Sequence, residues 1–271
     1  MKIAAEYIWY NSVNGFLSIS KTLFVDTPET KENFNILNEL MNINLYKDLY
    51  VDDLVLHPVS VRLDPFRKST NVIVLCEDAQ EKDSHRKQLE NIMNDNKSDE
   101  VLYEYSYEFS LSSNTSESVI SDASQNKYFN TVIGIPRKEA EHAYHTGLEC
   151  GLALNSFTRG AKPEQWNITF GQSIDIRIAD DVMFFRYILE RICEVHKKQV
   201  SYDSTCKNTI LLSHGKMRNK EIDCSNIAQE IIDSKLPKFV VGRNSENIVV
   251  LKNNDTLSES CPYMTLLSLL Q

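Results

Sequence analysis

Apolar and polar residues alternate most regularly between residues 101 and 111. The apolar set consists of Tyr103, Tyr105, Tyr107, Phe109 and Leu111, and the polar set consists of Glu104, Ser106, Glu108 and Ser110. Successive side chains of a β-strand point to opposite faces of a sheet. The alternation therefore predicts a strand that buries its aromatic face and presents glutamate and serine on the other face.

Further strands are predicted from short runs of β-branched and aromatic residues bounded by polar breaks. These runs cover residues 3–11, 17–25, 71–77 and 165–170. The first three precede any helical pattern, so the chain begins with a region made of strands.

Helices are predicted where apolar residues recur every three or four positions. The clearest covers residues 178–198, in which one stripe contains Ile178, Val182, Phe185, Leu189 and Ile192. Further helices are expected at 84–94, 136–150, 222–235 and 264–271. Residues 112–130, rich in serine and asparagine, are expected to form a surface loop and not a regulatory phosphorylation segment. Strands followed by a mixed region indicate an α+β protein of two domains.

Composition narrows the functional classes. The 271 residues are 42% hydrophobic and carry a net charge of -9. This charge would repel a polyanion, so we expect neither a nucleic-acid nor a membrane partner. No apolar run has the length of a spanning helix or the pattern of a signal peptide, and the six cysteines include no C-x-x-C pair. Reduced thiols and a cytoplasmic location are therefore expected.

Five blocks, in order along the chain, resemble eukaryotic-type glutamine synthetase. They are AEYIW at 5–9, DPFRK at 64–68 together with NVIVLCE at 71–77, PEQW at 163–166, RYILERICE at 186–194, and YD at 202–203. The resemblance implies a β-grasp domain at residues 1–82 and a truncated catalytic-type domain at 83–271. It also implies ring assembly, with each active site shared between neighbouring subunits.

The resemblance implies a reaction in which ATP phosphorylates glutamate and ammonia then displaces the phosphate. Such phosphoryl transfer needs divalent metals held by several carboxylates, and arginines around the phosphate. The family's first metal strand carries E-x-E. Here Ser106 replaces the first glutamate and Glu108 matches the second. The Cα atom of Glu104 lies about 13 Å from that of Glu108, against about 7 Å within E-x-E.

The next metal segment of the family, A-E-V-M-P-x-Q-W-E, is also changed. Gly160 and Asn167 replace its two glutamates. Arg159 and Lys162 add positive charge nearby, which we expect to repel a metal ion. The scaffold residues of the segment are kept while its ligands are replaced.

The nucleotide side is reduced as well. The family's glycine-rich loop has no counterpart after residue 203, and its histidine position falls on Lys207 or Thr209. Its arginine-rich segment has no counterpart between residues 250 and 258. Ser213 and Arg218 are candidate relics of this side of the site.

Three groups of residues have both a functional and a structural explanation. His142 and His145, three residues apart in the helix expected at 136–150, could bind a transition metal, but a solvated helix face is the commoner explanation and is preferred. Glu108 is either a relict metal ligand or an ordinary strand glutamate, and the second is preferred. A structural turn is sufficient to explain Arg67 and Lys68.

We therefore predict a protein that is not an enzyme, with no catalytic residues, no cofactor and no metal site, Glu108 being the one relict candidate. A protein that loses catalysis but keeps its fold retains binding as its usable property. The leading hypothesis is a pseudoenzyme that binds a protein partner, either itself or authentic glutamine synthetase subunits. A residual ligase or ligand binder with altered chemistry is the alternative. A drifting reading frame without present function is the third hypothesis.

Overall fold

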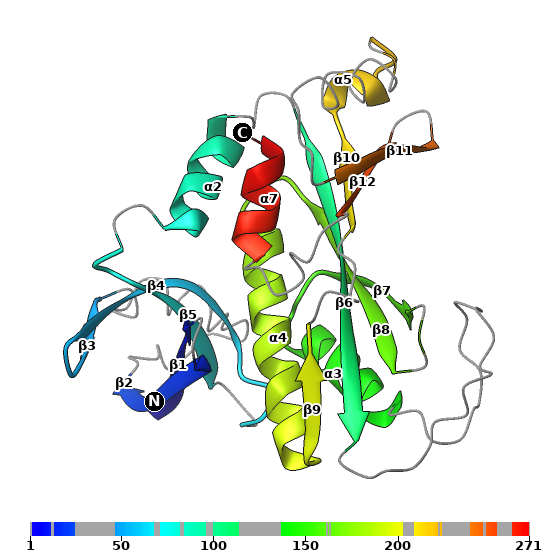
Figure 1. Ribbon diagram of the computed structural model, residues 1–271. Helices are drawn as coiled ribbons and strands as arrows, with labels where there is room; N and C mark the ends of the chain where they lie inside the picture. The colour runs from blue at the N-terminus through cyan, green and yellow to red at the C-terminus, as the bar shows by residue number, and fades with distance from the viewer. Residues whose placement is uncertain are drawn as a thin grey trace, which may run out of the picture. The chain divides into compact units, whose positions relative to one another are not determined.

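A computed structural model describes most of the chain (Figure 1). The described residues are 2–11, 14–24, 47–67, 71–81, 84–95, 100–113, 137–160, 162, 164–202, 209–221, 223, 239–245, 248–253 and 262–270. Almost all of the expected loop at 112–130 and of the expected helix at 222–235 lies outside them, as does Lys68. The contacts divide the chain into two compact units, Met1–Ser84 with Thr146–Leu152, and His85–His145 with Ala153–Gln271.

The first unit contains a five-stranded sheet in the order β2-β1-β5-β4-β3. Its strands are β1 (Lys2–Asn11), β2 (Gly15–Phe24), β3 (Leu49–Val51), β4 (Leu54–Leu63) and β5 (Val72–Asp78). The central pair, β1 and β5, is parallel, and every other pair is antiparallel. The strands predicted at 3–11, 17–25 and 71–77 are confirmed.

The core of this sheet follows the two-residue period of its strands. Ile3, Ala5 and Tyr7 of β1 lie in one buried cluster with Val72 and Val74 of β5, the strand beside it. Because these residues alternate along each strand, they occupy one face of the sheet. Burial of that face holds the central parallel pair together.

The second unit contains a seven-stranded antiparallel sheet. Six strands follow the order β11-β12-β10-β6-β8-β7, and β9 pairs with β6. They are β6 (Leu102–Ser113), β7 (Leu154–Arg159), β8 (Gln165–Ser173), β9 (Lys198–Ser201), β10 (Thr209–Ser213), β11 (Phe239–Ser245) and β12 (Ile248–Asn253). The strand predicted at 101–111 is β6, and its aromatic face is buried as expected.

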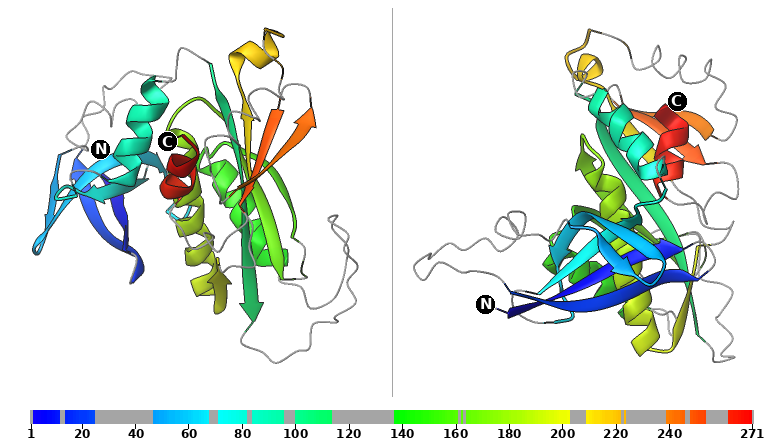
Figure 2. Two further views of the ribbon diagram at one scale, coloured as in Figure 1. Left: turned by 45° about the horizontal axis from the view of Figure 1, so that its top comes forward. Right: turned by 90° about the vertical axis from the view of Figure 1, so that its left-hand side faces the viewer.

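The described helices of this unit are α2 (His85–Asp95), α3 (Arg137–Glu149), α4 (Arg177–Val195), α5 (Gly215–Arg218) and α7 (Pro262–Leu270). Four of them confirm the expected helices at 84–94, 136–150, 178–198 and 264–271. Helix α4 runs alongside β6 (Figures 1 and 2). The ring of Phe185 in α4 lies 5.9 Å from that of Phe109 in β6 and 5.6 Å from that of Phe170 in β8. This aromatic contact joins the helix to the sheet.

A buried ionic network connects three helices of the second unit. Arg86 of α2 donates from Nε and Nη2 to the two carboxylate oxygens of Asp180 in α4, each at 2.8 Å. The hydroxyl of Tyr263 in α7 donates to Oδ1 of Asp180 at 2.7 Å. Asp180 is only 1% exposed. The network therefore satisfies a buried carboxylate and fixes α7 against α4.

A five-stranded mixed sheet, a seven-stranded antiparallel sheet and the described helices fit the α+β class. Among the described residues, no helix combines the length and the apolar character needed to cross a membrane.

Candidate functional site

The polar face of β6 is where the resemblance implies metal ligands. Ser106 donates from Oγ to Oδ1 of Asn167 in β8 at 2.7 Å. In the strand register Ser106 lies opposite Thr169, and Glu108 lies opposite Asn167. Two positions where the resemblance implies carboxylates are thus a hydroxyl and an amide, and they bind each other. This pair carries no charge and uses a donor and an acceptor that a ligand would otherwise meet.

The neighbouring strand β10 extends this uncharged row. Thr209, one of the two candidate histidine positions, lies opposite Ser106 on its other side. Thr209, Ser106 and Thr169 therefore lie side by side on three adjacent strands. Thr169 also places its Oγ1 3.5 Å from Oγ of Ser106. None of these side chains can supply the negative charge on which a divalent cation depends.

The two glutamates on this face occupy different surroundings. Oε2 of Glu104 accepts a 2.9 Å hydrogen bond from Nδ2 of Asn155. Its side chain also packs over Gly171, where an added Cβ would lie 2.9 Å from Cγ of Glu104. Glu108 is half-buried beside Asn167. Glu104 and Glu108 therefore lie two residues before and two residues after Ser106 on this face, and the residue between them is neutral.

The turn from β7 to β8 contains the other altered position, Gly160. Its N–H donates to the carbonyl of Gln165 at 2.8 Å, and the N–H of Gln165 donates to the carbonyl of Lys162 at 3.0 Å. A Cβ at Gly160 would lie 2.5 Å from Cβ of Gln165. A glutamate cannot replace this glycine unless the turn is rebuilt, a restriction that the sequence does not reveal.

Arg159 does not lie on the sheet face where the resemblance implies a metal. Arg159 lies opposite Trp166, whereas Thr158 lies opposite Asn167. Alternate residues of a strand face opposite sides, so Arg159 points to the buried face of the sheet and not toward Asn167. It is 4% exposed. Its charge therefore does not lie on the face that would have held the metal. Lys162 is exposed in the turn.

Two groups with raised pKa values, Glu190 and Tyr202, lie on the buried side of β6. The guanidinium of Arg186 lies 4.3 Å from the ring centroid of Tyr202, and the Tyr202 hydroxyl donates to Glu190 at 3.2 Å. Burial raises the pKa of Glu190, and the charge of Arg186 only partly opposes this effect. Desolvation also raises the pKa of Tyr202 well above its ordinary range. Structural networks perturb pKa values as catalytic ones do, and this group belongs to the core between α4 and β6.

The predicted solvated face of α3 is supported for its histidines. His142 is exposed and lies edge-on to His196, with ring centroids 6.4 Å apart, while His145 contacts the ring of Tyr144. Nδ1 of His196 lies 3.8 Å from Oε1 of Glu139. No group of three His, Cys, Asp or Glu side chains in the described part of the chain is arranged to hold a metal ion.

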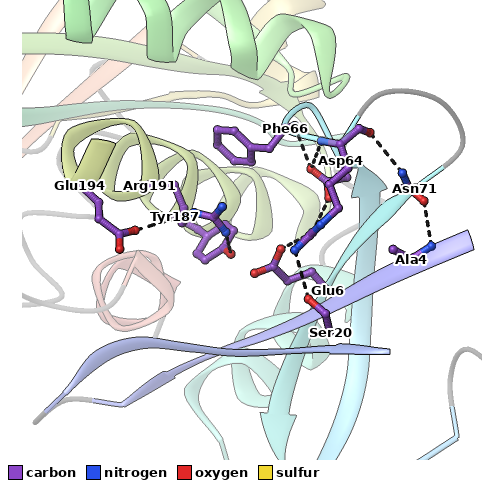
Figure 3. Close-up of polar contacts among 10 residues, drawn as sticks. Ala4, Glu6, Ser20, Asp64, Phe66, Asn71, Tyr187, Arg191 and Glu194 are labelled. Carbon is purple, nitrogen blue, oxygen red and sulfur yellow. Dashed lines mark hydrogen bonds and ion pairs between the residues drawn. The ribbon is translucent and has the colours of Figure 1, made fainter. Parts of the chain in front are cut away.

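The retained block at 64–68 forms a structural turn, as predicted for Arg67. Arg67 binds the carboxylates of Glu6 in β1 and Asp64, and donates from Nη2 to Oγ of Ser20 at 3.1 Å (Figure 3). Oδ1 of Asp64 also accepts from the N–H of Phe66 at 2.9 Å. Burial works against the charge of Arg67, but its hydrogen bonds to Asp64 and Glu6 raise its pKa overall. The block therefore ties the turn before β5 to β1.

Arg218, a candidate relic of the nucleotide side, is used in the same structural way. Its Nη1 donates to the carbonyl of Ser213 at 2.6 Å, and its Nη2 donates to the carbonyl of Glu100 at 2.6 Å. Lys207 lies outside the described residues.

Comparison with known proteins gives a consistent answer. No protein-family model matches the chain. Glutamine synthetase from Tuber borchii is 26% identical over 222 residues, and that from Debaryomyces hansenii is 26% identical over 214 residues. The enzyme from Saccharomyces cerevisiae is 24% identical over 221 residues. Each alignment covers 74% of this chain. The chain is homologous to glutamine synthetases.

The chain spans less than two thirds of these relatives, because the alignments cover 59%, 58% and 58% of the three enzymes. In this glutamine synthetase homologue, the loss of metal ligands at Ser106, Asn167 and Gly160 stays a prediction from the sequence. Sequence reasoning missed the hydrogen bond between the first two and the tight turn around the third. Neither has a sequence signal, because Ser106 and Asn167 are 61 residues apart and meet only through strand register.

Proposed function

We propose that this glutamine synthetase homologue does not make glutamine and acts by binding another protein. The observation that carries the proposal is the 2.7 Å hydrogen bond between Ser106 and Asn167. A metal site needs charged oxygen ligands at these positions, and here they are neutral and satisfy each other. Phosphoryl transfer without bound metal loses the charge neutralisation on which it depends.

The preserved parts of the chain support a binding role. The block that contains Arg67 is held by ion pairs with the buried carboxylates of Glu6 and Asp64, which is a structural use of the block. A fold maintained after its ligand positions are neutralised retains its surfaces. We propose that the partner is a second copy of the chain or an authentic glutamine synthetase.

We propose the domain layout on the same basis. The five-stranded sheet with a central parallel pair supports a β-grasp-like domain at residues 1–82, followed by a glutamine-synthetase-like domain at 83–271. Cys76, Cys150 and Cys193 are buried free thiols, which supports a reducing, cytoplasmic location. Burial raises the pKa of Cys76 and that of Cys193 to about 12, so neither is a reactive thiolate at neutral pH.

A γ-glutamyl transfer assay with Mg²⁺ or Mn²⁺ tests the catalytic half of the proposal. We expect no turnover above background, with an authentic glutamine synthetase assayed in parallel as the positive control. Turnover that is lost in Glu108→Ala would overturn this half and would favour a residual ligase.

Light scattering tests the binding half. The protein is measured alone and mixed with an authentic glutamine synthetase, whose activity is followed in the same samples. We expect either self-association or a change in the size or activity of the authentic enzyme. A strict monomer that leaves both properties unchanged would contradict the binding role.

A further inference from the structure

The outer edge of β2 is a long strand edge that pairs with no other strand in the described part of the chain. β2 is the terminal strand of the five-stranded sheet, and among the described residues no other strand pairs with its outer side (Figure 2). Its pairing with β1 runs without interruption from Phe24 opposite Lys2 to Gly15 opposite Asn11. The strand is therefore regular over ten residues. An edge of this kind presents unpaired N–H and C=O groups to any strand that approaches.

The other described sheet edges are protected in familiar ways. β3 has only three residues, and β7 has six with an irregular register near Leu154. The register of β11 shifts between Arg243 and Ser245. Short strands and bulges limit edge-to-edge pairing. β2 has neither protection, and within it only Lys21 carries a charge.

The side chains of β2 are exposed along this edge. Ser18, Ser20, Lys21, Thr22 and Phe24 are all exposed, and Phe24 is 73% exposed. On the core face, Ile19 and Leu23 are only partly buried against the core cluster. A strand added at this edge would cover Phe24 and extend the apolar face begun by Ile19 and Leu23.

We propose that this edge pairs with the same edge of a second copy of the chain, to form an antiparallel β2–β2 junction centred on Ser20. This inference deepens the proposed binding role by naming a partner and a surface. A two-fold axis normal to the sheet leaves opposed side chains on the same face, so the junction must be centred on one residue or on a like-facing pair.

The register centred on Ser20 is the one that the sequence of β2 favours. It opposes Phe16 with Phe24, Leu17 with Leu23, Ser18 with Thr22, and Ile19 with Lys21. Aromatic, aliphatic and hydroxyl pairs of this kind stabilise antiparallel strands. The nine residues extend about 30 Å and form about eight to ten backbone hydrogen bonds.

Alternative registers are poorer. A junction centred on Lys21 would place two lysines directly opposite each other, which is unfavourable. One centred on Ile19 would pair Leu17 with Lys21 and leave Phe24 without a partner in β2. One centred on Thr22 would shorten the overlap to five residues. The self-complementary pattern around Ser20 therefore identifies a second copy as the occupant.

Two charge-swapped variants test the register. Ser18→Lys with Thr22→Lys would oppose lysine with lysine at both symmetric positions of the junction. Ser18→Glu with Thr22→Lys would oppose glutamate with lysine at the same positions. Ser18 and Thr22 are both exposed. On β1 they lie opposite Ile8 and Ala4, which carry no charge. The two variants oppose different charges in the junction. They also differ by two charges per chain beside Ser20, which contacts Arg67 and lies opposite Glu6, so urea unfolding of each variant is measured alongside its association.

Light scattering over a dilution series should show a wild-type mass twice that of one chain. We expect the dissociation constant of the lysine–lysine variant to exceed that of the glutamate–lysine variant by about tenfold or more. Far-ultraviolet circular dichroism confirms that both are folded. Equal dissociation constants would overturn the junction while leaving self-association, and so the proposed function, intact.

A cysteine pair provides a second, independent measurement. In the junction, Ser20 opposes Ser20, within the Cα separation that a disulfide spans. Oxidation of Ser20→Cys should therefore yield a covalent dimer, whereas Ser18→Cys, about 13 Å from its copy, should not exceed the wild-type background. Equal crosslinking of the two variants, or a wild-type monomer throughout the dilution series, would overturn the inference. If that monomer still binds an authentic glutamine synthetase, the proposed function survives.

Discussion

Oγ of Ser106 and Oδ1 of Asn167 lie 2.7 Å apart across strands β6 and β8. A hydroxyl thus donates to an amide at two positions where the resemblance implies charged metal ligands. The pair satisfies itself inside the half-buried polar face of the sheet. Restoring charge there consequently changes both chemistry and stability.

The double variant Ser106→Glu with Asn167→Glu should remain inactive and be less stable. Two half-buried carboxylates at hydrogen-bonding distance repel each other, and the neutral bond is lost. We expect the free energy of unfolding at neutral pH to fall by about 1–3 kcal/mol, measured by urea denaturation.

The matched control is Ser106→Ala with Asn167→Ala, which removes both partners and should be nearly neutral. A marked rise in the stability of the glutamate variant on adding Mn²⁺ would mean that these positions still form a metal site, because a ligand that binds only the folded state stabilises it.

Replacing Gly160 by alanine should destabilise the β7–β8 turn. The added Cβ would lie 2.5 Å from Cβ of Gln165, so the backbone must shift. We expect a loss of about 1–3 kcal/mol in urea unfolding. Lys162→Ala, an exposed change in the same turn, should alter stability by about 0.5 kcal/mol or less. Equal losses in the free energy of unfolding for the two substitutions would show that the turn accommodates a Cβ at residue 160 without strain.

Removing Arg86 should be among the most costly substitutions in the second unit. Arg86→Met leaves the buried carboxylate of Asp180 without its ionic partner, which costs about 3–5 kcal/mol. Glu90→Ala removes the other carboxylate that binds Arg86, but that side chain is 41% exposed, and about 1 kcal/mol or less should be lost. Urea denaturation of both variants makes the comparison, and similar losses would contradict the assigned importance of Asp180.

Glu190 should make stability depend on pH in the acid range. Because its pKa is raised in the folded state above the ordinary value of 4.5, the folded protein holds this proton more tightly than the unfolded chain. The stability that this group contributes is therefore present below pH 4.5 and is lost as pH rises through the folded-state pKa.

Glu190→Gln removes this titration. The stability of the wild type relative to Glu190→Gln should decline as pH rises from about 4 toward neutrality, as measured by urea midpoints at each pH. Glu194→Gln makes the same chemical change on the exposed side of α4 and serves as the control. If the stability difference between the wild type and Glu190→Gln stays constant or increases as pH rises, the raised pKa of Glu190 is contradicted.

Strands β6 and β4 show how an interrupted pattern limits what the sequence predicts. β6 was predicted because its aromatic residues follow the two-residue period without a break. β4 was missed because Pro58 and polar residues interrupt its pattern, and the register in fact shifts between Pro58 and Ser60. Pro is tolerated in strands at such irregularities, but it removes the local signal.

The altered site positions were found by resemblance, but their contacts depend on tertiary register. Nothing near Arg159 in the sequence shows which face it occupies, because the face is set by pairing between β7 and β8 and β7 was not predicted. Strand pairs of this kind join segments far apart in the sequence, and the local pattern of one segment does not indicate which segment it pairs with. Residue types were therefore more predictable than their geometry.

The tight turn at Gly160 also bears on evolutionary history. A lineage that regained a glutamate at this position would first meet a steric conflict with Gln165, and the new carboxylate would have no charged neighbour at Asn167 or Ser106 to share a cation. Each single reversion is therefore costly before any benefit can be selected. Under the proposed function, single substitutions that restore one carboxylate at a time do not rebuild a metal site step by step.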